Sequence, residues 1–167
     1  VSEKEIRIQH PLFKQIIVPI LADQYKKGSA KHIRWIGQFE QFFYADFEMT
    51  KAFLENIKIT DYFDTIYFLE KSFSIDKNQN TLALLLNRIA QNIYYFTHEV
   101  PAGVLVYPEI FEKILLTFKK YLEQSATGEI WKTVLNEWEL IAKHWKIYFE
   151  NSDIYLNFED YLKTNQI

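Results

Sequence analysis

Residues 81–97 read TLALLLNRIAQNIYYFT and carry the clearest periodic pattern in the 167-residue chain. Apolar side chains recur there at intervals of three and four residues, at Leu82, Leu85, Leu86, Ile89, Ile93 and Phe96. This spacing places them on one face of an α-helix and predicts a helix with a single buried stripe. The polar run Asp76–Asn80 precedes the helix, and Pro101 and Gly103 are expected to follow its end.

The same periodicity predicts several helices before this stretch. A first helix through Phe13–Ile20 is expected to bend at Pro19, because an interior proline removes one backbone hydrogen bond. A second helix is predicted over Trp35–Phe47; it is apolar around more than half of its circumference and should therefore be central. A short third helix at Phe53–Ile57 and a fourth beginning near Thr60 complete this half of the chain.

Helices are also predicted after the deciding stretch, over Pro108–Leu122, from Thr127 to about Phe149, and over Ile154–Leu162. Apart from Val104–Val106, no segment alternates with the period of two that is typical of a strand. We therefore predict an all-α fold of seven to eight helices without significant sheet. Short connections favour an antiparallel helical bundle or stacked helix hairpins.

Length and composition predict one all-helical domain over residues 1–167, in which residues 1–10 form a poorly ordered N-terminal lead. The chain is 49% hydrophobic and has no linker rich in glycine, proline or serine. Its apolar runs are far shorter than the ~20 residues of a membrane span, so no span is expected. The charged start Val1–Glu5, with no apolar segment after it, predicts no secretory signal, and the absence of cysteine favours the cytoplasm.

Positive charge is concentrated near the start of the chain. Residues 1–36 contain seven Lys/Arg and three Asp/Glu, and the remainder contains twelve and nineteen, respectively. The turn at Lys26–Arg34 is similar in outline to a helix-turn-helix. However, Trp35 and Phe39 are expected to bind the second of these helices into a core, and the acidic remainder would repel phosphates. Nucleic-acid binding is therefore not expected.

The residue types that carry catalysis occur in no recognised arrangement. The four histidines, His10, His32, His98 and His144, have no second histidine three or four residues away and form no Glu-x-x-His motif. Four scattered glycines provide no phosphate loop, and there is no Gly-x-Ser-x-Gly elbow. We therefore predict no catalytic residues, no metal ligands and no cofactor.

Three tryptophans, Trp131, Trp138 and Trp145, recur every seven residues. Because a helix drifts only about 20° per heptad, their indoles share one stripe. One interpretation is a core stripe packed on neighbouring helices. The other is a groove for a ligand or protein segment, lined by indoles whose N–H groups need partners. Trp138 and Trp145 are therefore candidate binding residues.

The connection His98–Tyr107 is unusually apolar for a loop. It is interpreted either as a buried crossover or as an exposed patch that marks an interface or a pocket rim. In the second case, Leu105 and Tyr107 are candidate binding residues.

Together these features favour a small soluble intracellular protein that acts by protein–protein interaction. It would be an adaptor, an inhibitor, an immunity-like protein or a self-associating module, and not an enzyme. The alternative is a small-molecule-binding protein or enzyme with an aromatic-lined cavity between its helices. In that case Tyr94, His98 and Glu99, which cluster near one predicted helix end, would donate or accept protons.

Overall fold

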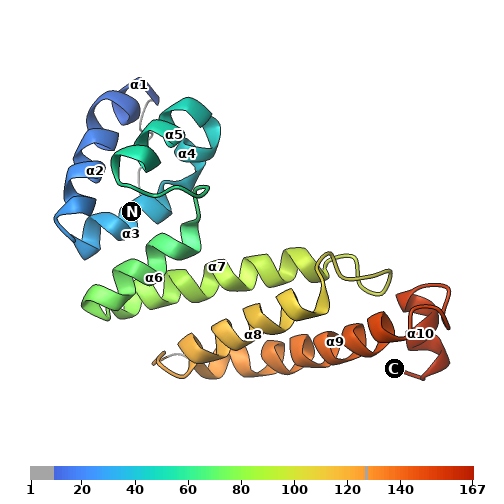
Figure 1. The fold of residues 1–167 in the computed structure, drawn as a ribbon. Coiled ribbons are helices and arrows are strands. Elements are labelled where there is room, and N and C mark those ends of the chain that lie inside the picture. The colour runs from blue at the N-terminus through green and yellow to red at the C-terminus, as the bar shows by residue number, and fades with distance from the viewer. Residues whose placement is uncertain (1–9, 127) are drawn as a thin grey trace, which may run out of the picture. The chain divides into compact units, whose positions relative to one another are not determined.

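A computed structural model describes residues 10–126 and 128–167, and every regular element among them is helical. The predicted all-α fold is therefore confirmed. The chain divides into two compact units, residues 1–81 and 82–167, here called the N-unit and the C-unit (Figure 1). The predicted poorly ordered lead lies outside the described residues except for His10, and the single-domain organisation stays a prediction.

The N-unit begins with three helical segments that follow one another without a gap: α1 (His10–Leu12), η1 (Phe13–Ile17) and α2 (Val18–Lys26). The segment η1 is a π-helix, in which the N–H of Val18 donates to the carbonyl oxygen of Phe13, five residues earlier. The bend expected at Pro19, which has no N–H to donate, stays a prediction. The structure has this wider turn immediately before the proline.

The predicted second helix over Trp35–Phe47 is wrong, because two breaks divide this stretch. At Phe39 the backbone leaves the helical region, with φ −89° and ψ 17°. At Asp46 it becomes extended, and the carboxylate accepts a hydrogen bond of 2.9 Å from the N–H of Met49. Asp46 is therefore a helix N-cap. The resulting helices are α3 (Ala30–Gln38), α4 (Glu40–Ala45) and α5 (Phe47–Asn56).

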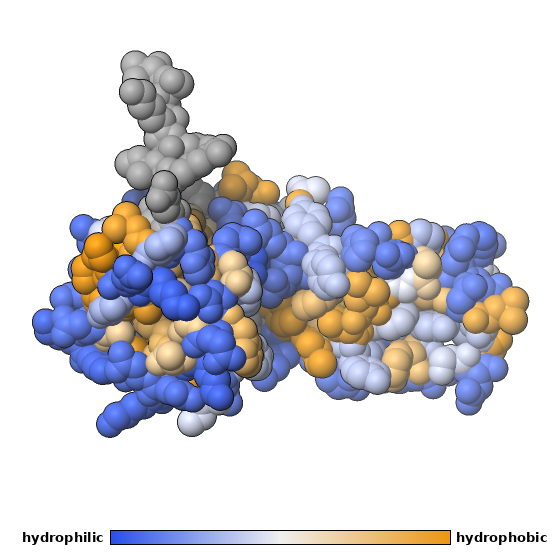
Figure 2. Space-filling view, turned by 90° about the horizontal axis from the view of Figure 1, so that it is seen from above, coloured by the Kyte–Doolittle hydropathy of each residue, from blue (hydrophilic) through white to orange (hydrophobic). Residues whose placement is uncertain are grey.

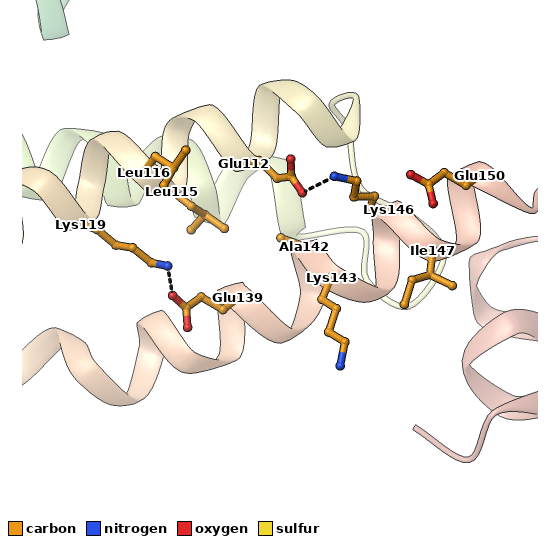
Figure 3. Close-up of a pocket in the computed structure, with 10 residues that line it drawn as sticks. All are labelled: Glu112, Leu115, Leu116, Lys119, Glu139, Ala142, Lys143, Lys146, Ile147 and Glu150. Atoms are coloured by element: carbon orange, nitrogen blue, oxygen red, sulfur yellow. Dashed lines mark hydrogen bonds and ion pairs between the residues drawn. The ribbon is translucent and has the colours of Figure 1, made fainter.

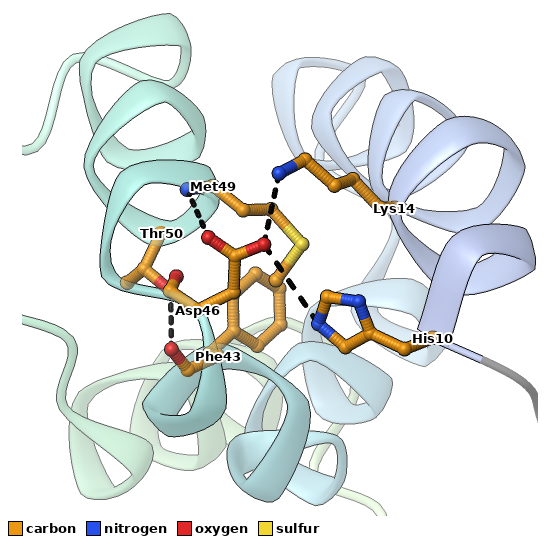
Figure 4. A network of polar contacts seen from close by, with 6 residues as sticks. All are labelled: His10, Lys14, Phe43, Asp46, Met49 and Thr50. Carbon is orange, nitrogen blue, oxygen red and sulfur yellow. Dashed lines mark hydrogen bonds and ion pairs between the residues drawn. The ribbon is translucent and has the colours of Figure 1, made fainter.

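The Asp46 carboxylate also ties the first helical segments to the α4–α5 junction (Figure 4). It accepts a hydrogen bond of 2.9 Å from Lys14 Nζ, and His10 Nε2 lies 3.8 Å from the same oxygen. The Lys14 contact lowers the pKa of Asp46 below its ordinary value of 3.8. At the same junction, the Thr50 hydroxyl donates to the carbonyl oxygen of Phe43.

Helix α6 (Thr65–Asp76) begins later than the predicted start near Thr60. The carboxylate of Asp64 accepts a hydrogen bond of 2.8 Å from the N–H of Ile66, which fixes the first turn. Helices α3 and α6 pack closely at Gly37, where an added Cβ would lie 3.2 Å from the side chain of Leu69.

The core of the N-unit is rich in phenylalanine. Phe13 stacks on Phe42 with a centroid separation of 4.3 Å, and Phe43 stacks on Phe63 at 4.6 Å. These rings come from η1, α4 and the loop before α6. Because aromatic pairs add to the free energy gained by area burial, they connect the short helices of this unit.

The C-unit contains most of α7 (Gln79–Thr97), whose first turn includes the boundary between the units, and four later elements. They are α8 (Pro108–Leu122), the 3₁₀ turn η2 (Gly128–Trp131), α9 (Lys132–Glu150) and α10 (Phe158–Thr164). The predicted helix over residues 82–96 is confirmed, with Leu82, Leu85 and Ile93 buried. Figure 1 shows α7, α8 and α9 as successive antiparallel helices.

Two boundaries in the C-unit differ from those predicted. The predicted helix start at Thr127 lies outside the described residues, and the regular α-helical part begins only at Lys132, after the 3₁₀ turn. The last helix begins at Phe158 and not at Ile154, which is exposed. Asn157 caps α10, because its side-chain oxygen accepts a hydrogen bond of 2.9 Å from the N–H of Asp160.

None of the described helices combines the length and hydrophobicity that a membrane-spanning helix requires.

Candidate functional site

Trp138, in the middle of α9, lies in the core of the C-unit with only 2% of its surface exposed. The rings of Tyr94 and Phe118 meet it edge-on, with centroid separations of 5.1 and 5.4 Å, respectively. Trp131 lies 6.3 Å away on the same stripe. The middle of the tryptophan stripe therefore packs α9 onto α7 and α8.

Trp145, one heptad later on α9, is half-buried and fastens the loop between α7 and α8. Its indole N–H donates a hydrogen bond of 2.8 Å to the carbonyl oxygen of Val106. On another side its ring meets Phe158 of α10 edge-on at 5.2 Å. One side chain thus ties both the loop and α10 to the C-terminal end of α9.

Three apolar side chains project around this loop attachment: Leu105, Tyr107 and Phe149, together called the loop cluster. They are 47%, 63% and 40% exposed, respectively. The Tyr107 ring meets Phe149 edge-on at 5.7 Å, and the Leu105 N–H donates to the carbonyl oxygen of Phe96. Val104 is buried, so the loop is anchored on one side and open on the other.

Phe149 belongs to this surface but was not a candidate from the sequence. It follows Trp145 by four residues, which places the two side chains on one face of α9, and their rings lie 6.0 Å apart. The spacing assigns Phe149 to the tryptophan face. The covering of that face is incomplete at the end of the helix, and only the structure shows this.

Exposed apolar side chains occur elsewhere as well. On the face that Figure 2 shows, orange apolar residues lie among blue hydrophilic ones. In the loop cluster, the Tyr107–Phe149 ring contact, the Leu105 backbone hydrogen bond to Phe96 and the Trp145 indole hydrogen bond to Val106 support the loop and its exposed side chains.

The structure brings together some of the polar candidates and separates others. His98 Nε2 lies 3.0 Å from Glu99 Oε1, and His98 Nδ1 lies 2.5 Å from the carbonyl oxygen of Tyr95. Tyr94 instead packs on Trp138. His98 and Glu99 are about half exposed, so this pair is in contact with water.

A groove of about 500 Å³ lies between α8 and α9, with buried Ala142 among its lining residues (Figure 3). Two ion pairs join the helices there: Glu112 with Lys146, at 2.9 Å, and Lys119 with Glu139. The hydrogen bond to Glu112 raises the pKa of Lys146 above its ordinary value. The groove is lined by aliphatic and charged side chains and by no aromatic ring.

Residues 10–126 and 128–167 contain no group of three or more His, Cys, Asp or Glu side chains placed to hold a metal ion. The absence of metal and cofactor stays a prediction from the sequence.

Acidic residues accompany the segments that form the loop cluster. Segments 89–112 and 147–162 contain seven Asp/Glu: Glu99, Glu109, Glu112, Glu150, Asp153, Glu159 and Asp160. The same two segments contain no lysine or arginine. Basic residues lie directly beyond the ends of both segments, at Arg88, Lys113, Lys146 and Lys163. Lys146 pairs with Glu112 and Lys163 with Glu159, so five of the seven carboxylates form no ion pair with a lysine or arginine in the part of the chain that the structure describes.

Comparisons of the chain with models of protein families, with characterised proteins and with solved structures found no match. Function therefore has to be argued from the residues themselves.

Proposed function

We propose that this chain acts by binding another protein inside the cell, as an adaptor or inhibitor, and that the loop cluster is its contact surface. The observation that carries the proposal is that Leu105, Tyr107 and Phe149 form an exposed apolar group on a fixed support. The proposal assigns no catalytic step to the chain.

The fixed support matters because binding is weakened by the entropy lost when mobile side chains and loops become ordered. The Trp145–Val106 hydrogen bond orders the loop before any partner arrives. The contact with Phe149 likewise restricts the Tyr107 ring. Aromatic side chains held in this way are the type that dominates binding energy at protein interfaces.

The acidic residues around the cluster define the partner's chemistry. Seven carboxylates lie in the two flanking segments, and only Glu112 and Glu159 pair with lysines, Lys146 and Lys163, so a complementary surface would carry lysines and arginines around an apolar pocket. We therefore propose a basic partner protein. Its association should slow as salt screens the attraction between exposed charges.

The test is affinity capture from a cell extract with three immobilised forms of the full chain: unaltered, Leu105→Asp and Ile130→Asp. Leu105→Asp places a charge in the loop cluster. Ile130→Asp is the matched control, since Ile130 is 72% exposed and lies in η2, before α9. Circular dichroism confirms that all three retain their helices.

We expect the unaltered chain and Ile130→Asp to retain a basic protein that Leu105→Asp does not retain. Raising the salt concentration should elute this protein. Retention of the same proteins by all three forms would remove the loop cluster as the binding surface. Retained proteins that are acidic, or insensitive to salt, would remove the proposed partner chemistry.

A further inference from the structure

The side of α9 that faces away from the tryptophan stripe carries a second regular pattern. Five exposed side chains recur at intervals of four, three, four and three residues: Asn136, Leu140, Lys143, Ile147 and Glu150, here called the outer stripe. Their average spacing of 3.5 residues is that of a coiled-coil contact line, which stays aligned with a partner helix. The two apolar members, Leu140 and Ile147, are one heptad apart.

Two charged members of the outer stripe lie on opposite sides of Ile147. Lys143 precedes it by four residues and Glu150 follows it by three. Within the part of the chain that the structure describes, neither forms an ion pair, whereas nearby Lys146 is held by Glu112. Figure 3 shows the Lys143 amine away from both ion pairs of the groove.

We propose that the end of the outer stripe, from Lys143 to Glu150, binds the same segment of a second copy of the chain, with the two helices antiparallel. In this direction a two-fold axis near Ile147 brings each Lys143 close to Glu150 of the other copy. A parallel pair would place like charges together. Because the positive charge precedes the negative one along the helix, two copies of this surface have complementary charges only when the helices are antiparallel.

Ile147 provides the apolar contact: it is 38% exposed and lines the α8–α9 groove together with Lys143 and Glu150. An axis near Ile147 brings the two Ile147 side chains together and removes them from water. Leu140 falls opposite residue 153 of the other copy, beyond the end of α9 at Glu150, and stays outside the contact. None of these residues belongs to the loop cluster, so this self-association goes beyond the proposed function and does not depend on it.

The test is a charge exchange measured by sedimentation equilibrium of the full chain over a range of concentrations. We expect the unaltered chain to show a concentration-dependent monomer–dimer equilibrium. Lys143→Glu and Glu150→Lys alone should each weaken dimerisation by about tenfold, because each places like charges together at two symmetric positions. The double variant Lys143→Glu/Glu150→Lys should restore the dimer, since it exchanges the two charges.

Lys113→Glu is the control, because it makes the same charge change at another exposed position, on α8, and should leave the dimer unchanged. A chain that stays monomeric at every concentration would overturn the proposal. So would a dimer whose strength the double variant fails to restore. If Leu105→Asp abolishes the dimer and the charge variants leave it intact, self-association occurs through the loop cluster. This result would also overturn the proposal.

Discussion

The middle of α9 and its C-terminal end carry the same kind of side chain in different surroundings. Trp138 is enclosed by Tyr94, Phe118 and Trp131. Trp145 lies on the same stripe, but there a loop crosses the helix and α10 packs from another side. Beyond Trp145 the stripe continues into Phe149, which is partly open to water.

The difference shows that the spacing of apolar residues identifies which face of a helix is apolar. It does not show how much of that face the rest of the protein covers. Helices α7 and α8 cover the middle of the stripe, whereas the α7–α8 loop and α10 cover its end. The loop presents its own apolar side chains outwards while its backbone satisfies the indole N–H. We therefore expect substitutions at the middle to change stability and substitutions at the end to change binding.

The largest expected effect is that of Trp138→Ala. Removing a buried indole leaves a cavity among three rings and should lower the free energy of unfolding by ~3–5 kcal/mol. Urea denaturation followed by circular dichroism measures this change. A loss below about 1 kcal/mol would show that the middle of the stripe is not core.

Trp145→Phe should have a moderate effect. The ring remains, but the N–H that binds the Val106 carbonyl oxygen is lost, with an expected cost of about 1 kcal/mol. Amide hydrogen exchange in residues 103–107 should become faster than in the unaltered chain. Unchanged exchange would mean that the indole does not order the loop.

The sequence predicted the helices more reliably than their ends. Leu82 and Ile93 were correctly placed on a buried face, because a long apolar stripe at helical spacing is typical of a helix packed on a core. The breaks at Asp46 and Asn157 were missed because apolar spacing continued across them. Both are side-chain caps whose signal consists of one short polar residue.

For the candidate site, the sequence named Leu105 and Tyr107 but left open whether they were buried. The loop that carries them is attached through a contact between residues 39 positions apart, Trp145 and Val106, which no local pattern contains. Phe149 was missed for the same reason, because the loop that leaves it partly open is distant in sequence.

Replacing His144 should change the free energy of unfolding by a smaller amount, which depends on pH. Burial, with a further contribution from Lys143, lowers the pKa of His144 below its ordinary value of 6.5 in the folded chain. The unfolded chain therefore takes up the proton first as pH falls. Stability should decrease as pH falls from 6.5 through the lower pKa of the folded state.

Thermal unfolding of His144→Gln and of the unaltered chain between pH 8 and pH 5 tests this expectation. The variant should lose less stability over that range. His144 Nδ1 lies 2.9 Å from the Tyr161 hydroxyl oxygen, so the comparison also reports on the packing of α9 against α10. An equal loss of stability with falling pH in His144→Gln and in the unaltered chain would contradict the assigned role of His144.

The smallest effect on stability is expected for Leu105→Asp. The side chain is already about half exposed, so the free energy of unfolding should change by about 0.5 kcal/mol or less. Urea denaturation beside Trp138→Ala provides the direct contrast. A loss as large as that of Trp138→Ala would make Leu105 a core residue and remove it from the binding surface.

Hydroxyl-radical footprinting of the folded chain, read by mass spectrometry at single residues, tests the division of the aromatic surface most directly. Tyr107 and Phe149 should be oxidised readily, and Trp138 should be protected despite the high intrinsic reactivity of its indole. Oxidation of Trp138 as fast as that of Tyr107, or protection of Tyr107 and Phe149, would contradict the assignment of a buried middle and an open end.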